Sequence, residues 1–436
     1  MKTIFTALII TFTASSALAG SINRYSSFSA EYTRTLNRAA TTDIDASFYN
    51  PAGLVFGKEG GYFGLANQFS YILGEFKQEE FSASNNQMSY ACPTMMGTYR
   101  SGNWAYYLSG GVLYGGVTEF GDNHPVFREN KSYVLSEIGK KGLEVADVEF
   151  SESKLNGLNF ILGGTAGISY KVDGWLGLSL GVKYAYSWGK LDIGSDFELL
   201  NKDGSLLADS SDVPALAAQM GFEGMDPNSD GRMVIQGQQT GHGVGLVVGV
   251  HVRPAKNLDI AIRAESSTKI INTISLDKDS YGIFTDGDES RNDIPGYLTS
   301  GIAYRPIPKL QLAASWGYYF NKFANLGAIL GFDITGMVDD GWEAGFGLDY
   351  EVTNNLTIGA GYLRLIAGYN DKSRSIVRFI LDSHHLSIGG TYQLTKKMNV
   401  TFGFMPMIYD SARDHQDITE ISGLIYNFGL GFSYGI

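Results

Sequence analysis

The sequence predicts an all-β protein, a transmembrane antiparallel β-barrel of about 14 strands, on three observations. Apolar and polar residues alternate strictly over long segments. Hydrophobic residues make up 44% of the 436 residues, yet no segment after the N-terminus has the roughly 18 consecutive apolar residues that a membrane helix needs. The chain is also rich in Gly (55), Tyr (26) and Phe (25). Together these features exclude a multipass helical protein and a disordered chain.

Strict alternation places two sets of residues on opposite faces of a strand. The clearest segment has the apolar set Trp342, Ala344, Phe346, Leu348, Tyr350 and Val352, and the polar set Glu343, Gly345, Gly347, Asp349, Glu351 and Thr353. We expect the polar set to face water. Such long segments are typical of strands that cross a bilayer, because strands of soluble sandwiches usually have about 5 to 6 residues.

About fourteen segments of this kind are predicted as strands, near residues 60–73, 88–100, 104–120, 159–172, 175–191, 234–253, 258–277, 295–305, 310–320, 341–353, 356–369, 384–395, 398–410 and 420–436. Outer-membrane barrels pair short periplasmic turns with long outer loops. We therefore expect six periplasmic turns, at residues 101–103, 173–174, 254–257, 306–309, 354–355 and 396–397. The longer connections between them are expected to face outward.

The N-terminus predicts export. Residues 1–19 have a positive Lys2, an apolar stretch from Ile4 to Phe12 and a small-x-small site at Ala17-Leu18-Ala19, as in a secretory signal peptide. Residues 58–436 are then expected to form the barrel in the outer membrane of a Gram-negative-type bacterium. Residues 20–57 are too many for a lead-in and too apolar for a disordered tail, so we expect them to plug the lumen.

Composition also limits the partners. A net charge of -12 without a Lys/Arg block argues against nucleic acid. The single cysteine, Cys92, excludes an internal disulfide and a multi-cysteine metal site. The sequence contains no catalytic constellation, so we expect neither an enzyme nor a cofactor or bound metal. We expect the protein to work as a monomer.

At Asn50-Pro51-Ala52 the chain resembles the FadL-like outer-membrane transporters of long-chain fatty acids and other hydrophobic compounds. Further pieces match in the same order: Gly243-Val244-Gly245 with Gly249 and Pro254, Ile294-Pro295 with Gly301 and Tyr304, and Asp382-Ser383 with Gly389. The resemblance implies that residues 20–57 form a hatch and that hydrophobic molecules, most of all long-chain fatty acids, pass without an energy source into outer-membrane lipid. Taken alone, Asn50-Pro51 would be read as a simple turn.

Three groups of candidate site residues follow. In the loop near 192–233, Asp212 is expected to cap a helix whose apolar face holds Val213, Leu216, Met220 and Phe222. The resemblance makes this face a landing groove for substrate, although a helix there would also serve simply to cap the barrel.

Two basic residues are candidates for a substrate headgroup, because alternation puts Lys183 and Arg263 on the polar faces of their strands. Arg263 is more simply explained as the ion-pair partner of Glu265, since such pairs are common in barrel interiors. Lys183 is the weaker candidate.

Two glycine pairs, Gly110-Gly111 and Gly115-Gly116, fall inside the third predicted strand. Glycine within a strand often marks a bulge or bend. The resemblance implies a kink here that opens the wall sideways for substrate exit, and the alternative is that small residues only make room for the hatch.

Other functions that fit the barrel are a porin for small polar solutes, and an adhesin or enzyme that uses the long outer loops.

Overall fold

The computed structural model describes residues 28–78, 81–89, 91–121, 131, 135, 144–212, 214–215, 230–280, 284–326, 328–329, 332–333, 336–374, 380–413 and 419–436. The signal peptide predicted for residues 1–19 lies outside these ranges. The barrel strands are β1 (Gly60–Gln78), β2 (Phe81–Ser89) with β3 (Thr94–Ser101), β4 (Trp104–Gly121), β5 (Asp147–Asp173), β6 (Leu176–Leu200), β8 (Met233–Ala255), β9 (Leu258–Glu265) with β10 (Ile271–Asp279), β12 (Gly296–Ile307), β13 (Leu310–Phe320), β16 (Gly341–Thr353), β17 (Leu356–Ile366), β18 (Ser383–Thr395), β19 (Met398–Tyr409) and β21 (Glu420–Gly435).

The smaller elements lie before, between and beside these strands. They are the helices α2 (Ala30–Thr35) and α3 (Ala46–Tyr49), the 3-10 helices η2 (Pro51–Phe56) and η3 (Asn321–Phe323), and the short strands β7 (Leu206–Asp209), β11 (Glu289–Arg291), β14 (Ala328–Ile329), β15 (Phe332–Asp333) and β20 (Ala412–Arg413). Among the described residues, no helix is long and apolar enough to cross a membrane.

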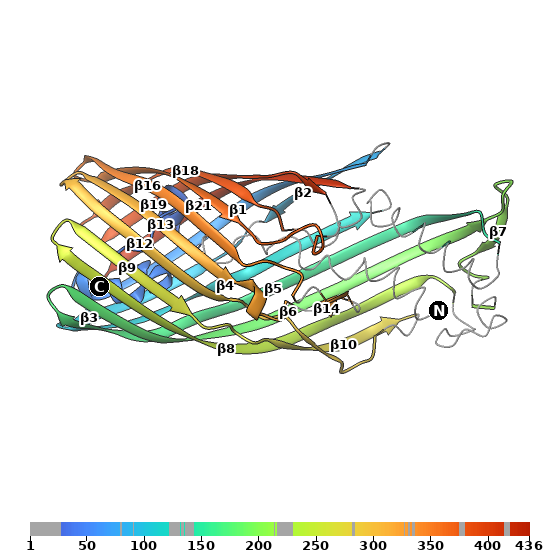
Figure 1. Ribbon diagram of the computed structural model, residues 1–436, viewed down its shortest axis with the longest axis horizontal. Helices are drawn as coiled ribbons and strands as arrows, with labels where there is room; N and C mark the ends of the chain where they lie inside the picture. The colour runs from blue at the N-terminus through green and yellow to red at the C-terminus, as the bar shows by residue number, and fades with distance from the viewer. Residues whose placement is uncertain are drawn as a thin grey trace.

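The sheet closes on itself (Figure 1). β1 pairs antiparallel with β21, from Tyr62 opposite Gly435 to Lys77 opposite Glu420. The result is a closed antiparallel barrel of 14 strands, which confirms the predicted fold class and strand count. Two of these strands are interrupted: β2 and β3 both pair with β1, and β9 and β10 both pair with β8.

The predicted strand boundaries are accurate where one face meets lipid. β13 and β16 have the predicted ends, and each of the six predicted turns joins two neighbouring barrel strands. The predictions for β5 and β6 were too short, since β5 begins at Asp147 and β6 continues to Leu200. Beyond the bilayer these strands carry outward polar residues such as Lys154 and Asp192, so the apolar alternation that identifies a lipid-facing strand ends before the strand does.

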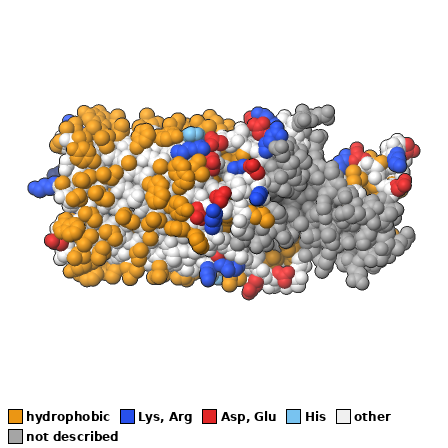
Figure 2. All heavy atoms as spheres, viewed as in Figure 1, with side chains coloured by type: hydrophobic (Ala, Val, Ile, Leu, Met, Phe, Trp, Pro, Cys, Tyr) orange, Lys and Arg blue, Asp and Glu red, His pale blue; other side chains and the backbone are white. Residues whose placement is uncertain are grey.

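The outer surface has the pattern of a membrane barrel. Figure 2 shows a broad hydrophobic band on the visible face, with charged side chains gathered beyond it. Exposed aromatic residues stand beside the short turns and again toward the outer end, as in the two girdles of outer-membrane barrels. The inner girdle includes Trp104, Tyr170, Tyr350 and Tyr392, and the outer one includes Tyr184, Trp316 and Trp342.

The N-terminal segment fills the barrel at the end with the short turns. α2, α3 and η2 lie inside the ring of strands, near the C-terminus at the left of Figure 1. α2 contacts β17, β18 and β19, whereas η2 contacts β5, β6 and β8 on the opposite wall. We call residues 28–59 the plug.

Candidate functional site

Asn50 shapes the plug and ties it to the wall. Its side-chain oxygen accepts a hydrogen bond from the Ala52 amide at 3.2 Å and so caps η2, whose first residue is Pro51. Its side-chain nitrogen donates to the Val250 carbonyl of β8 at 3.0 Å. The Asn-Pro-Ala motif is therefore both a local turn, as the simple interpretation held, and a contact between plug and barrel.

An ionic cluster, in which Arg38 and Asp45 are buried and Asp43 is exposed, holds the plug in shape. The guanidinium of Arg38 donates to both carboxylate oxygens of Asp45 at 2.8 Å and to Asp43 at 2.8 Å. The hydroxyl of Ser29, which caps α2, also donates to Asp45 at 3.2 Å. Burial alone would lower the pKa of Arg38, but the charges of Asp45 and Asp43 raise it well above its ordinary value. Arg38 therefore stays charged and keeps the cluster closed.

An ion pair fixes the plug to the opposite wall. The guanidinium of Arg34 lies 2.9 Å from the carboxylate of Asp349 on β16 and also contacts Thr391 on β18. The two charged side chains are only 6% and 12% exposed. Asp349 belongs to the set that the sequence predicted to face water, and this expectation was wrong because the plug occupies the interior at that position.

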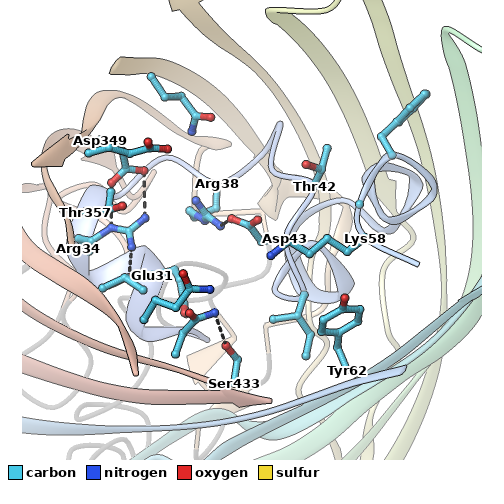
Figure 3. Close-up of a pocket in the computed structure, with 18 of the residues that line it drawn as sticks. Glu31, Arg34, Arg38, Thr42, Asp43, Lys58, Tyr62, Asp349, Thr357 and Ser433 are labelled. Carbon is cyan, nitrogen blue, oxygen red and sulfur yellow. Dashed lines mark hydrogen bonds and ion pairs between the residues drawn. The ribbon is translucent and has the colours of Figure 1, made fainter. Parts of the chain in front are cut away.

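A polar cavity of about 630 Å³ lies on the periplasmic side of the plug. Figure 3 shows Arg34 and Asp349 pointing toward one another on one side of it, with Arg38 and Asp43 at its centre and Lys58 and Tyr62 toward the other side. Turn residues such as Lys309 and Asn354 complete the lining. Burial, and then the charge of Asp45, raises the pKa of Glu31 at the edge of this cavity above its ordinary value.

Barrel glycines provide the space that the plug fills. A Cβ added to Gly177 of β6 would lie 2.6 Å from the Ala52 carbonyl, and one added to Gly301 of β12 would lie 2.6 Å from the Cβ of Ala39. Real Cβ atoms do not come so close to other atoms. Other glycines whose Cβ would run into the plug are Gly249, Gly347, Gly361, Gly403, Gly429 and Gly431. Part of the unusual glycine content therefore serves plug–wall packing.

One contiguous apolar cluster runs through the barrel from its tall outer wall to the plug. Three groups of residues form this cluster. The outer ends of β5, β6 and β8 contribute Val148, Leu155, Ile193, Phe197, Leu199, Met233 and Ile235. Other parts of the barrel contribute Ile161, Ile270, Leu363, Leu365, Met405 and Met407, and the plug contributes Phe28, Tyr32, Leu36 and Phe48. Phe28 and Phe48 stack with their ring centroids 5.0 Å apart. The plug thus adds apolar side chains to this cluster, whereas charged and polar side chains form most of the lining of the cavity beneath it.

The two predicted headgroup residues meet in one cluster. Lys183 of β6 and Arg263 of β9 both pair with Glu265, and all three are buried. The structure thus contains the ion pair that the sequence favoured for Arg263. The cluster carries one net positive charge, and the Nε atom of Arg263 has no hydrogen-bond partner in the described part of the chain. The hydroxyls of Tyr107 and Ser179, which the sequence did not single out, are also buried without a partner.

The third strand is irregular where the glycine pairs predicted it. The register of β4 against β5 shifts between Val112 and Tyr114, so Leu113 is a bulged residue between Gly110-Gly111 and Gly115-Gly116. β4 pairs with β3 only as far as Gly111, and in the described chain residues 112–121 pair with β5 alone. The Val112 amide still donates to the Pro93 carbonyl at 3.3 Å. Among the described residues, no strand pairs with β4 on that side above this point.

Other predicted features stay untested. Val213, Leu216, Met220 and Phe222 lie outside the described residues. Among the residues that are described, no group of three or more His, Cys, Asp or Glu side chains could hold a metal ion. The Ser383 hydroxyl lies 2.9 Å from Nε2 of His385 in the lumen, but no described residue hydrogen-bonds the other ring nitrogen, where a Ser-His-acid site needs a carboxylate.

Solved structures of other proteins have the same architecture as this chain. The chain aligns over 98% of its length with a FadL homologue of Pseudomonas aeruginosa (98% of that chain, 17% identity, TM-score 0.61) and over 96% with the toluene transporter TodX of Pseudomonas putida (98% of that chain, 16% identity, TM-score 0.58). The toluene transporter TbuX of Ralstonia pickettii is similar over 90% of this chain and 94% of its own (15% identity, TM-score 0.54). At these identities the likeness shows the fold.

The family assignment rests on a sequence model. No curated protein sequence matches the chain significantly. Residues 150–425 match the family model described as outer membrane protein transport protein (OMPP1/FadL/TodX). These proteins are outer-membrane β-barrels of Gram-negative bacteria, which confirms the predicted location. The chain belongs to the OMPP1/FadL/TodX family of outer-membrane transport proteins.

Proposed function

We propose that this protein is a passive channel through which hydrophobic compounds cross the outer membrane, with residues 20–57 acting as a hatch. The observation that carries the proposal is the contiguous apolar cluster inside a closed barrel, from the outer wall down to the plug. An apolar compound that enters it leaves water, and each buried CH₂ contributes about 0.8 kcal/mol. Partition into the lumen and consumption inside the cell are then enough to drive uptake.

The polarity of the two exits favours lateral release. Below the plug, the compound would have to enter a cavity lined by Arg34, Arg38, Asp349 and Lys309. Beside β4, no strand of the described chain pairs above Gly111 on the β3 side, and the bulged Leu113 packs against the apolar cluster. Because this side leads to the lipid phase, an apolar compound can leave here without meeting water. We therefore infer that the Gly110 to Gly116 segment forms the exit.

Long-chain fatty acids are the cargo that the sequence predicts, and the length of the apolar cluster supports a long alkyl chain. Monoaromatic hydrocarbons are the second candidate, because two of the similar structures are described as toluene transporters. Capture by the face of Val213, Leu216, Met220 and Phe222, and action as a monomer, remain predictions from the sequence.

The exit is tested by filling the kink. In cells that lack their own transporter, Gly110→Val with Gly111→Val is expected to reduce the initial uptake rate of radiolabelled oleate and toluene at least about tenfold. A Cβ at Gly111 would lie 2.5 Å from the Pro93 carbonyl, so the larger side chains would alter the wall where the proposed exit begins. Gly97→Val on β3 is the matched control, since nothing lies within 4 Å of a Cβ there. Unchanged uptake by a folded double variant would contradict lateral exit.

A porin for polar solutes makes a different prediction. Liposomes that contain an open polar pore swell quickly in sugar solutions, whereas liposomes with the plugged barrel are expected to remain impermeable. Rapid swelling with wild-type protein would favour the porin. An adhesin or enzyme would use the outer loops and would be unaffected by the kink substitutions.

A further inference from the structure

Glu343 is a buried carboxylate in the lumen, outside the cation cluster described above. It is 9% exposed. Two residues further along β16, toward the periplasmic end, Gly345 lies next to Asn37 of the plug. The hydroxyls of Tyr297 and Tyr319 each donate to it at 2.7 Å, one to each oxygen. The two tyrosine rings stack with centroids 4.7 Å apart, which fixes both hydroxyls.

The surroundings of Glu343 differ from those of the other buried acids. Five Asp and Glu residues are buried in the described chain. Asp45, Asp259, Glu265 and Asp293 each pair with at least one Arg or Lys. Among the described residues, no cation pairs with Glu343. Burying a carboxylate without a cation costs free energy, and the hydrogen bonds from the two tyrosines offset part of this cost.

Glu343 and the cation cluster form one polar belt across neighbouring strands. Tyr297 of β12 is the register partner of Glu265 on β9 and of Tyr319 on β13, and it reaches Glu343 on β16 through its hydroxyl. The belt thus contains two cations, Lys183 and Arg263, and two carboxylates, Glu265 and Glu343. Each oxygen of Glu343 accepts a hydrogen bond, as an ionised carboxylate can, and with Glu343 ionised the belt is electroneutral.

We propose that Glu343 determines specificity by excluding anionic cargo, so that the lumen admits hydrophobic compounds in their uncharged form. The inference rests on the proposed channel function and names the charge state of its cargo. A ligand carboxylate would add an uncompensated negative charge to a neutral belt in a water-poor interior. Two like charges about 6 Å apart in a protein change an equilibrium roughly 100-fold. Fatty acids therefore enter in their protonated, uncharged form, whereas alcohols, esters and hydrocarbons are uncharged already and enter without a change of protonation state.

The test compares two probes with the same alkyl chain. Binding of dodecanoate and of methyl dodecanoate to the full chain in lipid nanodiscs is measured by calorimetry at pH 8, with empty nanodiscs subtracted. The wild-type protein is expected to bind the ester at least about tenfold more tightly than the carboxylate. Glu343→Gln keeps the shape of the side chain and removes its charge. It is expected to strengthen dodecanoate binding about tenfold and to leave ester binding unchanged.

A further variant separates the charge of Glu343 from charge on the strand in general. Glu351→Gln removes an exposed charge from the same face of β16 below the plug. This variant should retain the preference for the ester. Equal wild-type binding of both probes would overturn the role of Glu343 while leaving the channel in place. Binding of neither probe would overturn the proposed function together with the selectivity that rests on it.

Discussion

The attachment of the plug depends on a few buried polar residues. Arg34 is the main charged contact, because its guanidinium meets both Asp349 and Thr391 on the wall. Wall hydroxyls add hydrogen bonds to plug carbonyls: Ser169 donates to Pro51 at 2.7 Å, and Thr94 donates to Phe28 at 2.6 Å. Removing one partner of a buried ion pair typically costs about 3–5 kcal/mol, because the other charge is left uncompensated. The plug is therefore held firmly but by a small number of groups.

Asp349→Asn is expected to weaken this attachment by about 3 kcal/mol, because it removes the carboxylate charge that the buried Arg34 contacts directly. The effect is measured by hydrogen exchange of the plug amides, which should speed up by up to roughly 100-fold while the barrel amides stay protected. Glu351→Gln, two residues along the same strand and exposed, is the control and should exchange like wild type. Equal exchange in the two variants would show that the ion pair does not hold the plug.

At the scale of elements, the plug and the strands are matched through glycine. Gly249→Ala on β8 would push a Cβ into the side-chain oxygen of Asn50 and to 2.5 Å from the Ser179 hydroxyl. Overpacking of this kind typically costs about 1–3 kcal/mol. The variant is expected to unfold at a lower temperature than wild type in a heat-modifiability assay on gels. Gly97→Ala, which has free space for its Cβ, should match wild type, and an equal loss in both would point to strand propensity instead of plug packing.

The sequence predicts elements better than it predicts partners. β13 and β16 have the predicted ends because lipid on one face imposes a strict alternation. The two interruptions, between β2 and β3 and between β9 and β10, were not foreseen, because they depend on how neighbouring strands meet and leave little trace in composition. The pairing of Glu343 with Tyr297 and Tyr319 joins residues from three strands, and only the register of the closed sheet brings them together. Alternation alone placed Glu343 in water.

At the scale of the whole molecule, the barrel and the plug have opposite tasks. The barrel pairs its strands around a closed ring, apart from the β4 segment above Gly111, and this pairing makes the wall stable in lipid. The plug blocks the lumen with α2 on one wall and η2 on the other. Because the strand pairings that close the ring belong to residues after 59, the barrel does not need the plug for closure. The channel proposed above uses this architecture to exclude ions while it admits an apolar compound from above.

Deleting residues 28–59 should convert the plugged barrel into an open pore, since the remaining 14 strands keep all their pairings. In planar lipid bilayers, we expect wild-type protein to show little steady conductance and the deletion variant to conduct at least about tenfold more, because water and salt would fill the vacated lumen. Arg34→Met, which keeps the plug but removes its ion pair to Asp349, should show brief openings between these limits. Heat-modifiability on gels checks that each variant is a folded barrel. If the folded deletion variant conducts no better than wild type, some other part of the chain closes the lumen and the plug is not the barrier.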